Sequence, residues 1–116
     1  MKRGDIYWAT LAPRSGAEQS GRRPVIILSH DAFNQTSGWR SIIVIPVSAS
    51  AAQARRGPTV VALSAGTAGL PSESSAICHQ VTTLDRAKLT DRIGALPQDI
   101  LALVEQALLA AVDIRR

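Results

Sequence analysis

Residues 41–49 have the sequence Ser-Ile-Ile-Val-Ile-Pro-Val-Ser-Ala, and this stretch decides which kind of fold the chain can form. Its run of β-branched apolar residues predicts a buried strand. Pro46 does not fit the interior of such a strand, because it has no N–H to donate to a neighbour, so we expect a sheet edge or a bulge there. Side chains alternate along a strand, which puts Ser48 on the face of Val44 and Pro46, where a buried row meets the rim.

Similar apolar stretches lie on either side of residues 41–49, separated by Gly, Pro, Ser and polar clusters. We expect strands at Asp5–Leu11, Pro24–Ser29, Ser41–Ala49, Pro58–Leu63, Ser75–Leu84 and, shorter, Arg92–Leu96. One convincing helix follows from Pro97 to about Val112, with an apolar stripe of Ile100, Leu101, Val104, Leu108 and Val112. The pattern predicts a mainly β (α+β) fold, in which a small, strongly curved antiparallel sheet or partly closed barrel carries a C-terminal helix.

The length and composition indicate one domain over residues 1–116. A chain of 116 residues with 46% apolar positions can form one core, whereas two cores would each be too small to offset chain entropy. Apolar residues nowhere approach the run of about 20 that spans a bilayer, and the N-terminus has no signal-peptide pattern. A single cysteine, Cys78, excludes an internal disulfide. We therefore expect a cytoplasmic protein with no membrane contact.

The charge favours an anionic partner. Thirteen Lys and Arg against nine Asp and Glu give a formal net charge of +4. Such a balance suits nucleic acid, although it also serves solubility alone. Two polar segments, Ala12–Arg23 and Ser50–Gly57, are candidate nucleic-acid-facing loops, and they contain Arg14, Arg22, Arg23, Arg55 and Arg56.

The residue types present exclude several kinds of chemistry. Two His and one Cys are too few for a zinc site, and the carboxylates show no metal-ligand spacing, so we expect no metal and no cofactor. Cys78 and His79 are neighbours in an expected strand, where adjacent side chains point to opposite faces and cannot form a thiol–imidazole dyad. We therefore interpret Cys78 as a buried structural residue.

RNA cleavage remains, because RNA supplies its own nucleophile in the 2′-hydroxyl beside each phosphate. The protein then needs only to move protons and to stabilise additional negative charge. Arginine suits the second task, since its guanidinium stays charged and binds two phosphate oxygens at once. Arg23 is the candidate, because it lies where a polar loop meets a buried strand.

Four segments, in order along the chain, resemble the MazF/PemK family of toxins. They are Lys2-Arg3-Gly4-Asp5-Ile6-Tyr7-Trp8, the segment that runs from Gly16-Ala17-Glu18-Gln19 to Ser29, Ile42–Ser50, and Gln80-Val81-Thr82-Thr83-Leu84-Asp85-Arg86. Asn34 follows Ser29 as in the family, and the likeness extends to Leu89, Ile93-Gly94 and the helix. The resemblance therefore covers nearly the whole chain.

The resemblance implies an SH3-like small β-barrel of the MazF/PemK/CcdB type that forms a homodimer and binds single-stranded RNA in grooves at the dimer interface. It also implies the toxin of a type II toxin–antitoxin system, neutralised by a MazE-like antitoxin. The activity it implies is sequence-specific, metal-independent cleavage of mRNA that leaves 2′,3′-cyclic phosphate and 5′-hydroxyl ends and so inhibits translation.

The same resemblance suggests roles for individual residues. Arg23 matches the family's catalytic arginine, and Ser48 matches the position of a catalytic threonine in many members. His79 is a departure, because PemK-type members carry an acid there, proposed as general base. We expect His79 to exchange protons with the 2′-hydroxyl or the leaving oxygen; the alternative is a partly buried structural role. The expected RNA-binding residues are Glu18, Arg22, Asn34, Gln80, Arg55 and Arg56.

Two further alternatives remain open at this point. Trp39, in a polar turn, suits either stacking on a base or covering the dimer interface, and we favour the interface. The same fold also serves CcdB-like toxins that poison DNA gyrase by binding alone, and an RNA-binding barrel without activity is a third possibility. The pairing of Arg23 with Ser48 favours the nuclease, because a gyrase poison has no need of it.

Overall fold

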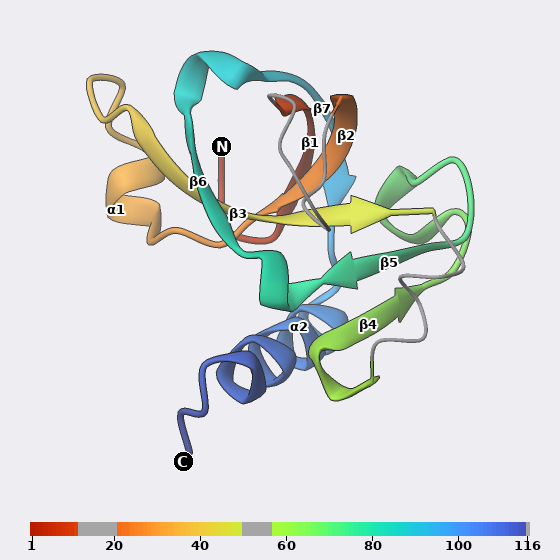
Figure 1. Cartoon of the computed structure of the whole chain (residues 1–116). Helices are drawn as coiled ribbons and strands as arrows, with labels where there is room; N and C mark the ends of the chain where they lie inside the picture. The colour runs from red at the N-terminus through yellow and green to blue at the C-terminus, as the bar shows by residue number, and fades with distance from the viewer. Residues whose placement is uncertain (12–20, 50–56, 116) are drawn as a thin grey trace.

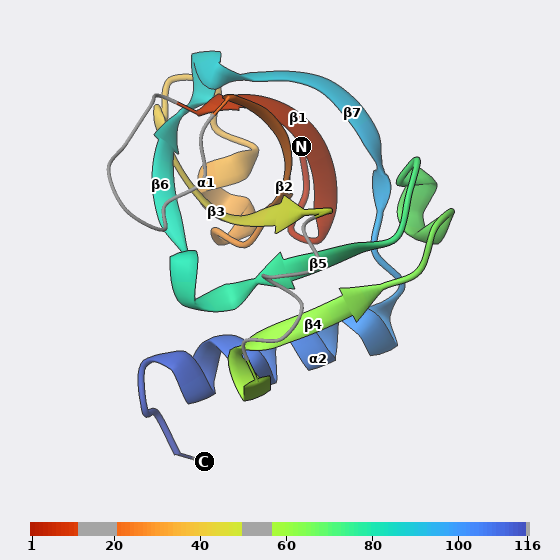
Figure 2. The same cartoon turned by 45° about the vertical axis from the view of Figure 1, so that its right-hand side comes forward.

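A computed structural model of the chain describes residues 1–11, 21–49 and 57–115. These residues form an antiparallel sheet that curls strongly upon itself, with a C-terminal helix packed beneath it (Figures 1 and 2). The strands are β1 (Asp5–Leu11), β2 (Gly21–Ile27), β3 (Ser41–Ser48), β4 (Val60–Leu63), β5 (Ser74–Ile77), β6 (Thr82–Asp85) and β7 (Leu89–Ala95). The helices are α1 (Asp31–Asn34) and α2 (Gln98–Ala111), with short 3₁₀ turns η2 (Gly57–Thr59), η3 (Thr67–Gly69), η4 (Cys78–Gln80) and η5 (Arg86–Lys88).

The central strand β3 has different partners on its two edges. The order of strands is β4-β5-β3-β2-β1-β7, and β6 also pairs with β3. One edge of β3 pairs with β2, from Ile27↔Val44 to Val25↔Pro46. The other edge pairs first with β6, ending at Val44↔Thr82, and then with β5, beginning at Val47↔Ala76. Residues 45–46 therefore lie where the second edge of β3 changes partners.

Pro46 occupies a position at which its missing N–H costs no pairing. Leu28 N donates to Ile43 O (2.9 Å), so Ile43 turns its polar backbone groups toward β2. In an antiparallel pair these groups alternate between edges, which turns the nitrogen of Pro46 toward the other edge. That edge is the gap between β6 and β5, so the expected irregularity at Pro46 is confirmed.

Alternating side chains of the curved sheet build two buried clusters. In β2, Ile26 packs in the cluster between the sheet and α2, whereas Val25 and Ile27 pack in the cluster inside the curl of the sheet. In β3 the same alternation places Ile45 in the first cluster and Val44 in the second. The face of the strand on which a side chain lies therefore decides which of the two clusters it joins.

Helix α2 begins after Pro97 and lays an apolar stripe on the sheet, as predicted. Leu101, Val104 and Ala107 are buried against the first cluster, and Ile100 and Leu108 pack beside them. Val112, expected at the end of the stripe, is instead exposed, because the helix ends one residue before it. Within the described residues no helix is long and apolar enough to cross a membrane.

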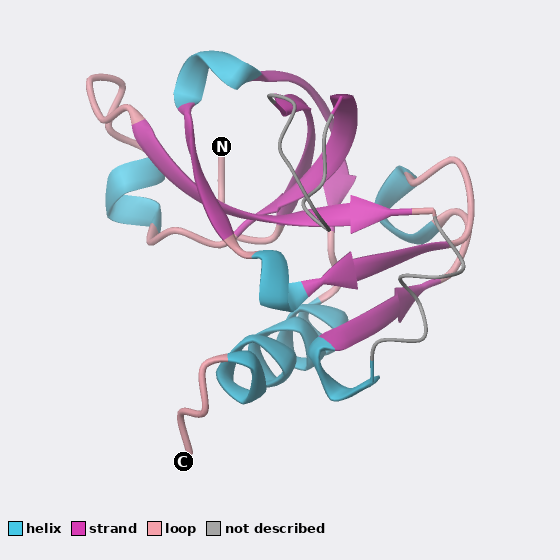
Figure 3. Ribbon diagram, in the orientation of Figure 1, coloured by secondary structure: helices cyan, strands magenta, loops and turns pink. Residues whose placement is uncertain are grey.

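The mainly β fold with a C-terminal helix is confirmed, and the boundaries needed corrections. The expected single strand Ser75–Leu84 is wrong, because η4 divides it into β5 and β6 (Figure 3). This division lets β5 pair with β4 and with the end of β3, while β6 pairs with the start of β3. β2 and β7 begin earlier than expected, and the four-residue helix α1 has no helical pattern in the sequence.

The stability of the fold should depend on the buried face of α2. Replacing Leu101, which is 5% exposed, with Ala should lower the free energy of unfolding by about 2–4 kcal/mol, because a cavity opens beside the first cluster. The same change at Leu103, which is 53% exposed on the same helix, should cost about 0.5 kcal/mol or less. Urea denaturation at one protein concentration measures both variants, and equal losses would contradict the packing described here.

Candidate functional site

Arg23 of β2 and Ser48 of β3 lie at the same end of two neighbouring strands. The described β2–β3 pairs run from Ile27↔Val44 to Val25↔Pro46. Continuing this register by two residues aligns Arg23 with Ser48, just beyond the last pair. Alternation puts both residues on the face of the cluster inside the curl, so they continue two of its buried rows toward the surface.

Exposure distinguishes the two residues. Arg23 is exposed, whereas Ser48 is only 6% exposed. An exposed cation and a buried hydroxyl thus lie at the same end of two neighbouring strands. Such an arrangement suits an anion whose position the hydroxyl defines and whose charge the guanidinium balances.

Ser75 is a neighbour of Ser48 that the sequence did not single out. The two residues pair across β3 and β5, and Ser75 is 4% exposed. Directly opposed residues have Cβ atoms about 4.5–5.5 Å apart, so two buried serines meet here. The sequence carries no signal for this pairing, because it depends on where β5 begins to pair with β3.

Arg22 lies on the opposite face of β2 from Arg23. Its guanidinium carbon stands 4.2 Å from the centre of the Trp8 ring, and its Nη2 is 3.5 Å from Asp91 Oδ2. Trp8 is half-buried, and the guanidinium of Arg22 lies over its ring. The two adjacent arginines therefore face different sides of the sheet and belong to separate surfaces.

His79 and Gln80 lie in η4, the turn between β5 and β6. His79 is exposed, and its Nδ1 forms a hydrogen bond with Thr59 Oγ1 (2.8 Å). Ser75, the partner of Ser48, lies toward the other end of β5 from this turn. Continuing the strand register thus aligns Arg23 with Ser48, whereas the structure places His79 on a separate turn, held to η2.

Cys78 is buried, as expected, although it lies in η4 and not in a strand. Its side chain is fully enclosed, and the thiol donates to the carbonyl oxygen of Ala76 (3.8 Å). Burial disfavours the charged thiolate and raises the pKa of the Cys78 thiol to about 12. The side chain is therefore a packing element of the first cluster, in which it lies.

Asn34 is the expected RNA-binding residue that the structure places inside the protein, and this expectation does not fit its surroundings. Its Nδ2 donates to Ser29 O (2.7 Å) and to Asp31 Oδ1 (3.0 Å), and its Oδ1 accepts from Ser29 Oγ (2.6 Å). The side chain is 2% exposed and ties α1 to the end of β2. Both of its N–H groups are already engaged.

Trp39 forms an exposed aromatic pair with Phe33. The rings are stacked at 4.5 Å, and both residues remain more than 40% exposed. The guanidinium of Arg86 donates to the carbonyl oxygens of Phe33 and Trp39, among others, and so fixes this turn. The exposed surface of this pair is accessible to a base or to a second copy of the chain.

Three expected RNA-binding residues, Glu18, Arg55 and Arg56, lie outside the described residues. Among the residues that are described, no three His, Cys, Asp or Glu side chains gather at one point.

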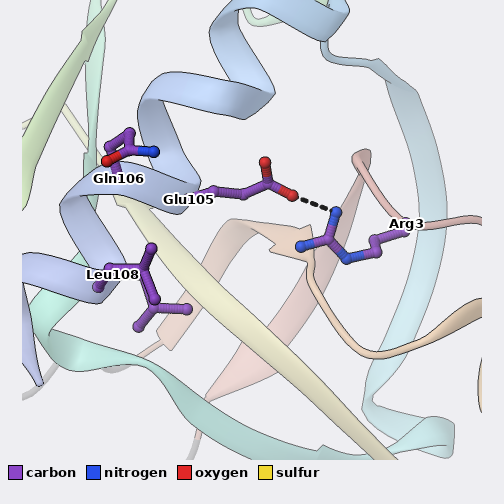
Figure 4. A pocket seen from close by; sticks show the side chains of 5 residues that line it. Arg3, Glu105, Gln106 and Leu108 are labelled. Carbon is purple, nitrogen blue, oxygen red and sulfur yellow. Dashed lines mark hydrogen bonds and ion pairs between the residues drawn. The ribbon is translucent and has the colours of Figure 1, made fainter. Parts of the chain in front are cut away.

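A cavity of about 350 Å³ lies between the N-terminal segment and α2 (Figure 4). Its charged groups are Arg3 and Glu105, which are joined by a hydrogen bond from Nη1 to Oε2 (2.5 Å). Arg3 also donates through Nε to Leu28 O (3.0 Å). These internal bonds neutralise the arginine, so this cavity has little to offer a phosphate.

Comparisons with known proteins give one consistent result. Residues 2–112 match the family described as PemK-like, MazF-like toxin of type II toxin–antitoxin system. The chain is 36% identical to endoribonuclease EndoA of Bacillus subtilis, with 97% of each chain covered. A crystal structure of MazF from Deinococcus radiodurans is 28% identical, covers 97% of this chain and 96% of that one, and has a TM-score of 0.79. A crystal structure of MazE-MazF from the same organism has a TM-score of 0.73 at 27% identity and covers 99% and 97%.

The burial of Cys78 predicts that its thiol reacts slowly in the native protein. Because its pKa is raised to about 12, iodoacetamide at pH 8 should alkylate the folded protein at least ~100-fold more slowly than the protein in urea. Mass spectrometry measures the alkylated fraction directly, since the chain has a single cysteine. Similar rates in both states would show that the thiol is accessible.

Proposed function

The chain belongs to the PemK-like, MazF-like toxins of type II toxin–antitoxin systems, and from this premise we propose how its own residues cleave RNA. The similarity to endoribonuclease EndoA, named above, places RNA cleavage ahead of gyrase poisoning. The substrate is single-stranded mRNA, whose cleavage inhibits translation. The observation that carries the proposal is that Arg23 and Ser48 each lie two residues beyond the last described β2–β3 pair, Val25↔Pro46, at one end of the two strands.

The reaction is a transesterification that needs no metal. The 2′-oxygen attacks the adjacent phosphorus and loses its proton, while the bond from phosphorus to the 5′-oxygen breaks and that oxygen gains a proton. The products are a 2′,3′-cyclic phosphate and a 5′-hydroxyl. The protein supplies position, charge and proton transfer, because the nucleophile belongs to the RNA.

Arg23 stabilises the negative charge that develops on the phosphate oxygens. Its exposed guanidinium reaches outward from the rim and binds two such oxygens at once. Ser48 donates a hydrogen bond to one phosphate oxygen from a buried and therefore fixed position. Fixed donors cost little reorganisation during the reaction, which is the source of their effect.

His79 is the proposed proton-transfer group. Its exposed imidazole is accessible to a substrate, and the hydrogen bond between Nδ1 and Thr59 leaves Nε2 as the atom that exchanges protons. The placement of His79 in η4, away from Ser75 along β5, requires the scissile phosphate to lie between the Arg23 rim and this turn. Gln80, in the same turn, supports the RNA and does not react.

The partners follow from the family and the charge. We propose that two copies form a homodimer and that an acidic, MazE-like antitoxin neutralises the toxin in the cytoplasm, where the mRNA is. The net charge of +4 complements an acidic antitoxin segment as well as RNA. The MazE-MazF structure from Deinococcus radiodurans is a precedent for such a complex.

The roles of Arg23 and Ser48 predict specific losses of activity. In excess EDTA, the protein should cut mixed-sequence single-stranded RNA to cyclic-phosphate ends. Arg23→Ala should lower kcat by about 10²–10³, and Ser48→Ala by about 10-fold or more, because each removes a donor to the developing charge. Arg115→Ala, a change at an 87% exposed side chain near the C-terminus, is the control and should cut normally.

Uncut RNA under all these conditions would refute the nuclease and favour a toxin that acts by binding. Cleavage by Arg23→Ala at the wild-type rate would instead move the charge-stabilising role to another residue.

The role of His79 predicts a change in the pH profile. If its imidazole exchanges the proton, His79→Gln should lower kcat about 10²-fold and change the shape of the pH profile of kcat/KM. A structural role would lower kcat evenly at every pH and leave the shape of the profile intact.

A further inference from the structure

Arg22, Trp8 and Asp91 form a three-strand cluster that the proposed reaction does not use. They come from β2, β1 and β7, which lie side by side in the sheet (Figure 2). The guanidinium of Arg22 rests over the ring of Trp8 at 4.2 Å and approaches Asp91 at 3.5 Å. Three features of this cluster point to an anion-binding function.

The first feature is a bulge in β7 that brings Asp91 close to Arg22. β1 and β7 pair at Tyr7↔Arg92 and at Ala9↔Leu89, so two residues of β7, Thr90 and Asp91, face the single residue Trp8. Thr90 Oγ1 donates to Trp8 O (3.3 Å) within this bulge. Bulges redirect side chains, and this one brings the Asp91 carboxylate to the arginine of a strand that does not neighbour β7.

The second feature is the unequal strength of the two contacts of Arg22. The ion pair is long and exposed, with side-chain exposures of 54% for Arg22 and 78% for Asp91. Such pairs contribute little stability and exchange readily. The contact with Trp8 holds the guanidinium over the indole ring, so its N–H groups stay available when the carboxylate leaves. The carboxylate oxygen therefore marks a place where another anionic oxygen can bind.

The third feature is the free stretch of β2 at this end. Among the described residues, the ladder between β2 and β3 covers only Val25–Ile27, so residues 21–24 of β2 are paired with β1 and have no described pair on the edge that faces β3. Arg23 and Arg22 project to opposite faces of this stretch. An RNA chain bound at Arg23 passes the edge of β2 that faces β3. It then reaches Arg22, the next residue along the strand, on the opposite face.

We propose that Arg22 binds a second phosphate of single-stranded RNA, that Trp8 is its positioning residue, and that Asp91 occupies Arg22 until the phosphate displaces it. The inference rests on the proposed function, from which it takes RNA as the ligand. It goes further by assigning a competitor carboxylate, which lowers the affinity of the free toxin for RNA.

Binding of a probe that cannot be cut tests the proposal independently of cleavage. The probe is a fluorescent, mixed-sequence, single-stranded RNA with 2′-O-methyl groups, which block the attacking oxygen. Asp91→Asn should lower Kd about 3-fold at low salt, because the competitor is gone. Arg22→Gln should raise Kd about 5-fold and reduce the slope of log Kd against log salt by about 0.7, the value for one phosphate on a single strand.

Matched controls remove the effect of net charge. Asp113 and Arg115 form an exposed ion pair near the C-terminus at 3.2 Å. Asp113→Asn and Arg115→Gln therefore change the charge equally, and they should leave the salt slope unchanged. The proposal is wrong if Asp91→Asn binds no tighter than Asp113→Asn, or if Arg22→Gln and Arg115→Gln have the same slope.

A double-mutant cycle tests the positioning role of Trp8. Trp8→Leu should weaken binding about as much as Arg22→Gln does, and it should have little further effect in the Arg22→Gln background, whereas Trp8→Phe should retain most of the affinity. If the two substitutions reduce the affinity for the probe additively, Trp8 has a purely structural role, and its proposed positioning role is wrong.

Cleavage of unmodified RNA, measured alongside, separates the two proposals. Cleavage by the wild type without the expected differences in binding overturns the Arg22 contact alone. Probe binding with the expected differences, but without cleavage, overturns the proposed function and supports the contact.

Discussion

The pairing of β3 is the constraint on which the rest of the structure depends. Its two edges serve three strands, because β2 takes one edge while β6 and β5 divide the other. The division falls at Pro46, whose nitrogen faces the gap and has nothing to donate there. A residue with an N–H at this position would leave that donor facing a gap. Proline thus marks the point where the sheet changes direction and begins to cover α2.

The alternation of side chains carries this constraint to the functional surface. The rows that fill the curl of the sheet end in Arg23 and Ser48, and the rows that face α2 continue toward Arg22 and Trp8. The adjacent residues Arg22 and Arg23 therefore have different surroundings, because side chains alternate between the two faces of β2. One is exposed beside a buried hydroxyl, and the other lies on an aromatic ring within reach of a carboxylate.

The chemistry of RNA cleavage explains why the proposed reaction needs only a few protein side chains. Since RNA carries both nucleophile and leaving group, the protein needs a fixed donor, a cation and a proton-transfer group. The remaining polar side chains mainly organise the framework. Asn34 holds α1 to Ser29, which follows β2, and Arg86 holds the turn that contains Phe33 and Trp39. Their internal hydrogen bonds distinguish them from residues that are available to a substrate.

The sequence by itself determined the approximate places of most strands, the terminal helix, the irregularity at Pro46, the burial of Cys78 and the family, because each depends on local composition, periodicity or ordered motifs. Only the tertiary structure decided the rest. The split of the expected strand at η4, the pairing of Ser48 with Ser75 and the bulge that brings Asp91 to Arg22 all depend on register between strands far apart in the chain. The burial of Asn34 likewise depends on how the segment around α1 folds back onto Ser29. Register is set by the packing of whole faces, and a single stretch of sequence contains only one side of each pair.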